Sequence, residues 1–135
     1  MNQIESNKTQ AKHFLEYLAK TDFDNLRQLL EDQMQYILPG KSPLATHLTS
    51  AAELSDFLHS AFSGKVAQAK FEILNITAED NRVAVEATGL FEFKNGLIYE
   101  NIYHFLFHFN DLNKITQLTE HMDSYHATKL FVGGE

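Results

Sequence analysis

The sequence contains no cysteine, and it has fewer basic than acidic residues. Without cysteine the chain can form no disulfide, has no thiolate nucleophile and cannot bind zinc through sulfur. Its 11 lysine and arginine residues stand against 18 aspartate and glutamate residues, which leaves a formal charge of −7. A surface of this sign repels phosphate backbones and anionic lipids. We therefore expect neither nucleic acid nor a membrane as a partner.

Long apolar runs are also missing. No stretch approaches the ~20 residues that a membrane-spanning helix needs. The opening residues, MNQIESNKTQAK, lack the apolar core of a signal peptide. The chain carries no glycine-rich phosphate-binding motif either. These absences lead us to expect a cytoplasmic protein that works without a cofactor.

What the sequence does contain is enough apolar side chain for the core of one domain. The 135 residues are 44% hydrophobic and 12% aromatic. No repeat, low-complexity tract or linker divides them. We expect a single domain over residues 1–135, with its core at about 7–123 and no element assigned to the tail 124–135.

Hydrophobic spacing predicts three helices and a series of strands. Apolar residues recur at helical spacing over 7–19, and Thr21 offers a cap for a second, short helix. Ser50 and Glu53 form a capping box that opens a third helix, whose apolar stripe includes Phe57. Strands are expected at 34–38, 68–78, 82–93, 96–109 and 114–123. This order predicts an α+β domain with helices on one face of a curved antiparallel sheet.

The stretch 96–109, GLIYENIYHFLFHF, is mostly apolar on both faces. A strand with one wet face alternates apolar and polar side chains. Here the odd-numbered positions carry mostly tyrosine and phenylalanine, and the even-numbered positions carry mostly isoleucine, leucine and histidine. Each face of this strand must therefore be covered by something.

Two segments resemble a known superfamily. DFDNLRQLLEDQMQYILPGKSPLA is similar to the helix-turn, strand and Pro-Gly loop of the nuclear transport factor 2-like superfamily. YENIYHFLFHFNDLNKITQLTEHMD resembles the last hairpin of its SnoaL-like and ketosteroid-isomerase-like branch. The resemblance covers roughly residues 7–123, through the order of elements and scattered positions.

The resemblance implies a cone-shaped α+β barrel of the cystatin-like kind, with a curved antiparallel sheet packed against about three N-terminal helices. It implies an apolar pocket between the sheet and the helices, which would hold a small hydrophobic molecule. It also implies a homodimer through the outer face of the sheet. One face of strand 96–109 would then line the pocket, and the other would meet a second copy of the chain.

Turn chemistry predicts how the strands pair. Asn95-Gly96 is typical of a two-residue type I′ turn. Counting back from this turn places Glu86 opposite Phe105. One row along, Thr88 lies opposite Tyr103.

A second turn at Leu112-Asn113 places Glu120 opposite Phe105 and Met122 opposite Tyr103. In the family that the chain resembles, the positions that match Phe105 and Glu120 point inward. We therefore expect the row Glu86–Phe105–Glu120 on the pocket face. A bulge in either hairpin would shift the register and exchange the two faces.

The residues of ketosteroid isomerase chemistry are absent. That enzyme uses an aspartate base, with a tyrosine and a protonated aspartate to hold the oxyanion, and it is a worked example of pKa tuning. The matching positions here are Leu38 for the base, Phe14 for the tyrosine and Phe105 for the second aspartate. All three are apolar, so this chemistry is excluded.

The candidate catalytic residues are therefore Glu86, Glu120 and His47. Two carboxylates in one apolar pocket push their pKa values apart and provide one acid and one base. His47, in the loop before the third helix, is a candidate general base at the pocket entrance. The candidate ligand-binding residues are Phe14, Tyr36, Leu38, Phe57, Thr88, Asn101, Tyr103, Phe105 and Met122.

Structural readings of the same residues stay open. Each glutamate can bond a tyrosine or a backbone amide, or face solvent, and His47 can lie on the surface. Tyr36 and Tyr103 can simply complete a core. His104 and His121 become cross-strand neighbours on the outer face, where an interface pair is favoured over a metal site because no third ligand is evident.

Three functions remain. The chain can be a cofactor-independent acid–base isomerase, cyclase or hydrolase acting on a hydrophobic, oxygenated ligand. It can bind such a ligand without turnover, or it can be a structural dimer whose aromatic residues fill its own pocket. Whether it is an enzyme is left open by the sequence.

Overall fold

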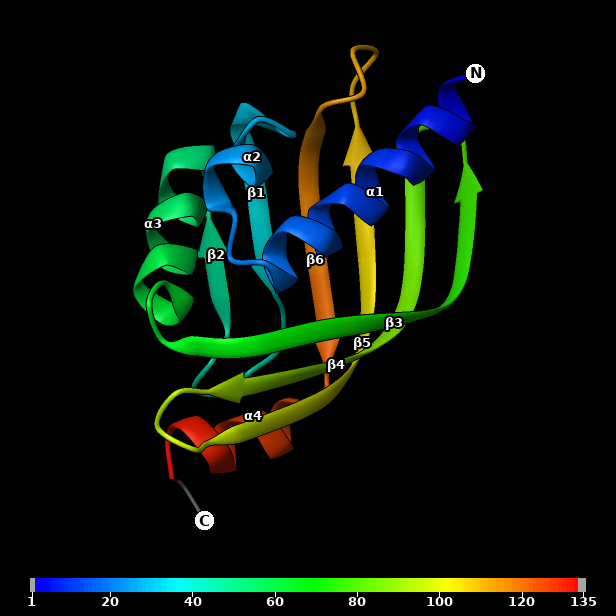
Figure 1. The fold of residues 1–135 in the computed structure, drawn as a ribbon. Coiled ribbons are helices and arrows are strands. Elements are labelled where there is room, and N and C mark those ends of the chain that lie inside the picture. Colours follow the sequence, from blue (N-terminus) through cyan, green and yellow to red (C-terminus); the bar gives the residue numbers. More distant parts are fainter. Residues whose placement is uncertain (1, 134–135) are drawn as a thin grey trace.

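The computed structural model describes residues 2–133, which form one six-stranded sheet and four helices (Figure 1). The elements in chain order are α1 (Gln3–Ala19), α2 (Phe23–Arg27), β1 (Leu30–Leu38), β2 (Thr46–Leu48), α3 (Ala51–Phe62), β3 (Val66–Glu79), β4 (Arg82–Phe93), β5 (Ile98–Phe109), β6 (Ile115–Met122) and α4 (Ser124–Phe131). Among these residues, no helix is long and apolar enough to cross a membrane.

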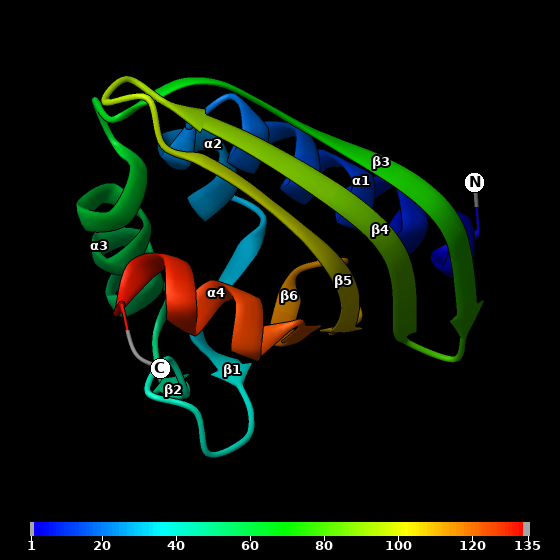
Figure 2. The same ribbon diagram turned by 90° about the horizontal axis from the view of Figure 1, so that it is seen from below.

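The sheet has the strand order β2-β1-β6-β5-β4-β3 and curves strongly. Its long strands β3, β4 and β5 bend around α1 and α2, while α3 stands beside β1 and β2 (Figures 1 and 2). The α+β class and the helices on one face of a curved sheet are confirmed. The sheet stays open between β2 and β3, and one pair, β1 with β6, is parallel because the chain crosses over between them.

The first helix begins earlier than its apolar spacing predicts. The side chain of Asn2 accepts a hydrogen bond of 2.8 Å from the backbone N–H of Glu5, and this cap starts α1 at Gln3. The predicted apolar stripe is confirmed, since its members are buried: Ala11, Phe14, Leu15 and Leu18. They form the part of the core that faces the sheet.

The capping box before α3 is confirmed in part. The hydroxyl of Ser50 accepts a hydrogen bond of 3.1 Å from the N–H of Glu53. The carboxylate of Glu53 reaches one residue further back than the standard box and accepts from the backbone and the hydroxyl of Thr49. The bonds of Ser50 and Glu53 together determine where α3 begins after the short strand β2.

The turn between β4 and β5 has three residues, which corrects the predicted register. Phe93 donates its N–H to the carbonyl of Leu97, and Gly96 takes a φ of 94°. A three-residue loop of this kind ends in a left-handed residue, which glycine supplies without strain. The extra loop residue moves the pairing by one position.

Glu86 therefore lies opposite His104, and Val85 lies opposite Phe105. Thr88 lies opposite Ile102. Because a shift by one residue exchanges the faces of a strand, Glu86 and Thr88 point to the outer face and not to the concave one. The expected row Glu86–Phe105–Glu120 is wrong in its first member.

The pairing of β5 with β6 is as predicted, although its turn is not. Glu120 lies opposite Phe105, and Met122 lies opposite Tyr103. The turn again has three residues, with Asn113 at a φ of 60°, and this alone would shift the register. An irregularity at His108/Phe109 shifts it back, so the two deviations cancel.

The tail left without an element forms α4. The carboxylate of Asp123 caps this helix by accepting from the N–H of His126 at 3.1 Å. Figure 2 shows α4 lying across the end of the cone, between α3 and β5. The tail thus adds a wall to the space that the sheet and α3 enclose.

Candidate functional site

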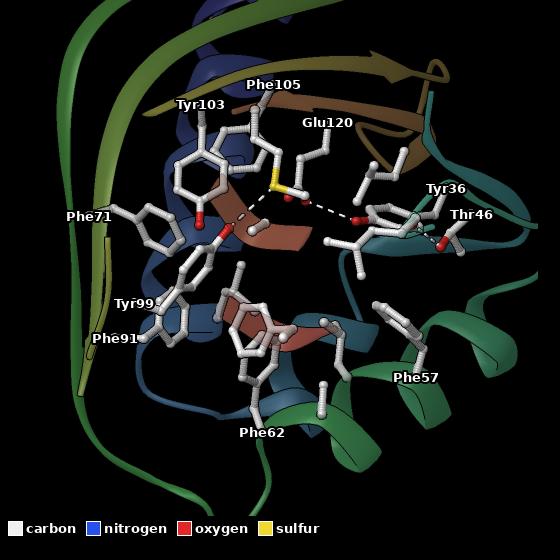
Figure 3. A pocket seen from close by; sticks show the side chains of 18 of the residues that line it. Tyr36, Thr46, Phe57, Phe62, Phe71, Phe91, Tyr99, Tyr103, Phe105 and Glu120 are labelled. Atoms are coloured by element: carbon white, nitrogen blue, oxygen red, sulfur yellow. Dashed lines mark hydrogen bonds between the residues drawn. The ribbon is translucent and has the colours of Figure 1, made fainter. Parts of the chain in front are cut away.

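A cavity of about 460 Å³ lies between the concave face of the sheet, α3 and α4 (Figure 3). Most of its lining is aromatic or aliphatic. Seven phenylalanines contribute, from three strands and two helices: Phe57, Phe62, Phe71, Phe91, Phe93, Phe105 and Phe131. Within residues 2–133, three tyrosines, Thr46 and one carboxyl side chain supply most of the polar atoms of the lining, and the tyrosines are Tyr36, Tyr99 and Tyr103.

The strand period explains how β5 builds one wall of the cavity. Tyr99, Tyr103 and Phe105 are at odd-numbered positions, and all three point to the concave face. The rings of Tyr103 and Phe105 stack with centroids 5.1 Å apart, and Phe71 from β3 meets Tyr103 edge-on at 5.6 Å. These contacts hold the rings in place around the space.

Gly89 on β4 makes the contact between Phe71 and Tyr103 possible. A Cβ at this position would lie 2.8 Å from Tyr103 Cε2 and 2.9 Å from Phe71 Cε1. Any larger residue would push one of these two rings out of its place. The glycine therefore shapes the wall formed by β3, β4 and β5.

Glu120 is the one carboxyl side chain among the described residues that line the cavity. The hydroxyl of Tyr36 donates a hydrogen bond of 3.0 Å to Glu120 Oε1 (Figure 3). Burial raises the pKa of Glu120 from 4.5 to about 7, and the hydrogen bond from Tyr36 opposes part of this rise. A carboxyl group with this pKa changes its charge near neutral pH.

The three tyrosine hydroxyls of the cavity stay neutral. Burial raises the pKa of Tyr36, Tyr99 and Tyr103 above the ordinary value of 10.0, and the negative charge of Glu120 adds to the rise. Each phenol is therefore a hydrogen-bond donor at neutral pH. No lysine, arginine or histidine is among the described lining residues, so a cation is missing from this wall.

The structure brings seven of the sequence-predicted residues together. Around the cavity lie Tyr36, Leu38, Phe57, Tyr103, Phe105, Glu120 and Met122. Leu38 stands at the end of β1, and Phe57 is 39% exposed on α3. Their part in binding a ligand stays a prediction.

Two of the three candidate catalytic residues lie elsewhere. Glu86 is exposed on the outer face, where it accepts a hydrogen bond of 2.8 Å from Asn75. His47 is exposed on β2, with its Nε2 2.8 Å from the side-chain oxygen of Gln35. Thr46 lines the cavity, so the alternation of this strand turns His47 away from it.

Three candidate ligand-binding residues also lie outside the cavity. Thr88 faces the outer side of the sheet after the register shift. Phe14 is buried in the core, edge-on to Phe107 with centroids 5.4 Å apart. Asn101 is buried behind Tyr99, and its amide is used by hydrogen bonds within the protein.

Several lining residues were not singled out from the sequence. Tyr99 shares the odd-numbered face of β5 with Tyr103, so strand alternation alone could have identified it. Phe71 needed the pairing of β3 with β4, and Phe131 lies in the unassigned tail. His104 and His121 are cross-strand neighbours, exposed on the outer face. Among residues 2–133 no group of three or more potential ligands could hold a metal.

A family model described as a SnoaL-like domain matches residues 11–118. The chain belongs to the SnoaL-like domain family. This membership agrees with the order of elements, the open cone and the cavity at its end. A search of curated proteins found no match.

Solved structures of this SnoaL-like chain's fold include proteins of different activities. An LEH-like epoxide hydrolase from M. tuberculosis is 22% identical, with a TM-score of 0.80, and the match covers 98% of this chain and 94% of the other. A putative polyketide cyclase from Xanthomonas campestris pv. campestris is 17% identical, with a TM-score of 0.77 and coverages of 96% and 98%.

An NTF2-like protein from Burkholderia xenovorans LB400 is 20% identical, with a TM-score of 0.72 and coverages of 94% and 96%. At these identities the similarity establishes the NTF2-like fold of the SnoaL-like domain. It leaves the activity to the residues of the cavity.

Proposed function

We propose that this SnoaL-like protein is a cofactor-independent acid–base enzyme that acts on a hydrophobic, oxygenated small molecule as an isomerase, a cyclase or a hydrolase. The observation that carries the proposal is the placement of Glu120 as the one carboxyl side chain among the described residues that line an aromatic cavity. Apolar cavities with a few convergent polar groups are the usual form of small-molecule sites. Relatives of the same fold described as an epoxide hydrolase and a putative polyketide cyclase support the reaction class.

Glu120 acts as the base in this mechanism. The hydroxyl of Tyr36 holds Oε1 by a hydrogen bond of 3.0 Å, which stabilises the carboxylate and leaves Oε2 to take a proton from a carbon atom or from water. With a pKa of about 7, Glu120 is both deprotonated and basic enough to accept a proton near neutral pH. Tyr36 is a positioning residue, because it acts through Glu120.

The test compares two glutamates of the same sheet. The wild-type protein is first screened with apolar epoxides, unsaturated ketones and polyketones. For the substrate that is found, Glu120→Gln should lower kcat/KM by ~10²- to 10⁴-fold. Glu86→Gln is the matched control and should keep full activity, since Glu86 is exposed on the other face. The wild-type kcat/KM should rise with pH through about 7. Full activity of Glu120→Gln would remove the mechanism.

The density of aromatic rings favours a second function, which is binding without turnover. Seven phenylalanines surround one carboxyl group, and one of its oxygens is already bonded to Tyr36. This function is supported if native mass spectrometry finds a retained apolar ligand while no compound of the panel is converted. Glu120→Gln would then leave the retention of that ligand unchanged.

We also propose a homodimer through the outer face of the sheet. Ile98 and Ile102 project from this face of β5 and are 56% and 65% exposed. Burial of such side chains against a second copy would remove apolar surface from water, which stabilises association. The proposal concerns the face opposite to the cavity.

A further inference from the structure

The amide of Asn101 on β5 has one defined orientation. Its Oδ1 accepts two backbone N–H groups, from Ile102 at 2.7 Å and from Asp123 at 3.0 Å. Its Nδ2 donates to the carbonyl of Asp123 at 3.1 Å and to the hydroxyl oxygen of Tyr99 at 2.6 Å. A flipped amide would place a donor against two N–H donors, so the flip is excluded. Asn101 is 7% exposed and holds this arrangement inside the protein.

This orientation determines the direction of the Tyr99 hydroxyl. An amide NH₂ group only donates, so the oxygen of Tyr99 must accept from Asn101, and its own proton is free to point elsewhere. The Tyr99 hydroxyl donates this proton to the sulfur of Met122, with 3.3 Å between the oxygen and the sulfur. Tyr99 also shares a hydrogen bond with Tyr103, which lowers the pKa of Tyr99 and raises that of Tyr103, as expected when Tyr103 donates and Tyr99 accepts. A thioether is a weak acceptor, so the proton of Tyr99 itself has only a weak partner among the described residues.

Donation from Asn101 also strengthens the Tyr99 donor. Hydrogen bonds in a chain polarise one another, and a hydroxyl that accepts a bond donates a stronger one. Tyr99 and Tyr103 both line the cavity, and Figure 3 shows their hydroxyl groups pointing toward one another. Two phenol groups thus gather on one side of the cavity, away from the bond between Tyr36 and Glu120.

We infer that Tyr99, oriented by Asn101, is the donor that binds an uncharged acceptor oxygen of the ligand, such as a ketone, ether or epoxide oxygen. A ligand oxygen would replace the sulfur of Met122 as the acceptor of the Tyr99 hydroxyl. The ligand is therefore an apolar skeleton with a neutral acceptor oxygen at the end opposite to the atom on which Glu120 acts. Since Tyr99 lies in the same cavity, this role rests on the proposed function.

The charge of the cavity excludes an anionic ligand. The lining residues include the carboxyl group of Glu120 but, among those described, no cationic side chain. A ligand carboxylate would lose its hydration in an apolar space without a counter-ion, which is costly. A neutral carbonyl oxygen loses only a hydrogen bond to water when it enters the cavity, and a hydrogen bond from a phenol replaces it without any charge.

The fluorescent ketone PRODAN, a propionyl-substituted dimethylaminonaphthalene, tests this donor directly. Its emission moves to longer wavelength when its carbonyl accepts a hydrogen bond. The control ligand is the propyl analogue, in which a methylene group replaces the carbonyl. The wild-type protein should bind the ketone more tightly than the analogue by about three- to tenfold, the ratio expected for one neutral hydrogen bond.

Tyr99→Phe should remove this preference and move the emission of the bound ketone to shorter wavelength. Tyr125→Phe is the matched control, because Tyr125 is 67% exposed on α4, outside the lining. Met122→Leu removes the competing acceptor, so it should raise the affinity for the ketone relative to the analogue even if Tyr99→Phe fails to fold.

Three results would overturn the inference: Tyr99→Phe that keeps both the preference and the emission, equal binding of the two compounds by the wild-type protein, or no binding of the ketone. Binding by Glu120→Gln separates this inference from the proposed function. That variant should still prefer the ketone, even though its turnover is lost. Loss of turnover in Glu120→Gln with no effect of Tyr99→Phe would leave the enzyme assignment standing and remove the donor role.

Discussion

At the scale of single residues, the same side chain has opposite properties on the two faces of the sheet. Glu86 and Glu120 come from strands on either side of β5. Glu86 is exposed and bonded to Asn75, whereas Glu120 faces an aromatic cavity that raises its pKa to about 7. The chemistry of a carboxyl group is therefore decided by the side of the strand from which it projects.

The raised pKa of Glu120 predicts a loss of stability with increasing pH. Between pH 4.5 and about 7 the folded protein keeps a proton on Glu120 that the unfolded chain releases, so the free energy of unfolding falls as the pH rises through this window. At ~1.36 kcal/mol per pKa unit, the loss is up to about 3 kcal/mol.

Urea denaturation at pH values on both sides of this window measures the effect. Glu120→Gln carries no charge at any of these pH values, so its stability relative to the wild-type protein should increase as the pH rises. Glu86→Gln should follow the wild-type curve, since that side chain is exposed. A constant difference between the wild-type protein and Glu120→Gln across the window would contradict the raised pKa.

At the scale of elements, α4 closes the cavity although few of its side chains are buried against the rest of the domain. Phe131 meets Tyr99 edge-on with centroids 4.8 Å apart and lies 6.2 Å from Phe93, but it is still 44% exposed. The helix is also held by the fully buried Ala127, by the stacking of His126 on Tyr99, by its Asp123 cap and by Asn101, which bonds the backbone of Asp123. An element with few buried contacts opens more readily than the sheet beneath it.

Phe131→Ala should therefore release α4 without unfolding the domain. We expect a loss of about 1–2 kcal/mol in the free energy of unfolding, below the ~3–5 kcal/mol for a fully buried phenylalanine. Hydrogen exchange measured by mass spectrometry should become faster in 124–131 and stay unchanged in β5. Equal acceleration in both segments would show that α4 is part of the cooperative core.

At the scale of the whole molecule, the outer face of the sheet is the surface that the proposed homodimer would bury. Ile102→Glu places a charge on this face and should convert a dimer into a monomer in sedimentation experiments, because a charge buried without a partner is costly. Leu112→Glu is the control, since Leu112 is 78% exposed at the tip of the last hairpin. A monomeric wild-type protein, or a dimer that Ile102→Glu leaves intact, would refute the proposal.

The local elements of this protein follow from short stretches of sequence. Helical spacing predicted the buried stripe of α1, and the Ser50–Glu53 pair predicted the start of α3. The two apolar faces of β5 and the aromatic residues at its odd-numbered positions could also be read directly. Local propensity and side-chain period decide these features, so a single segment carries all the information.

The site itself depends on pairing between segments, which short stretches do not determine. One additional loop residue at Lys94 turned Glu86 and Thr88 outward, while an irregularity at His108/Phe109 restored the pairing that brings Glu120 to Phe105. Such shifts depend on how neighbouring strands pack, and each one exchanges the two faces. The sequence by itself determined the first three helices, the five longer strands and the family, but not α4 or the short strand β2. Only the tertiary structure decided which carboxyl group is desolvated and which phenol is left with a weak acceptor, because burial and hydrogen-bond partners come from residues far apart in the chain.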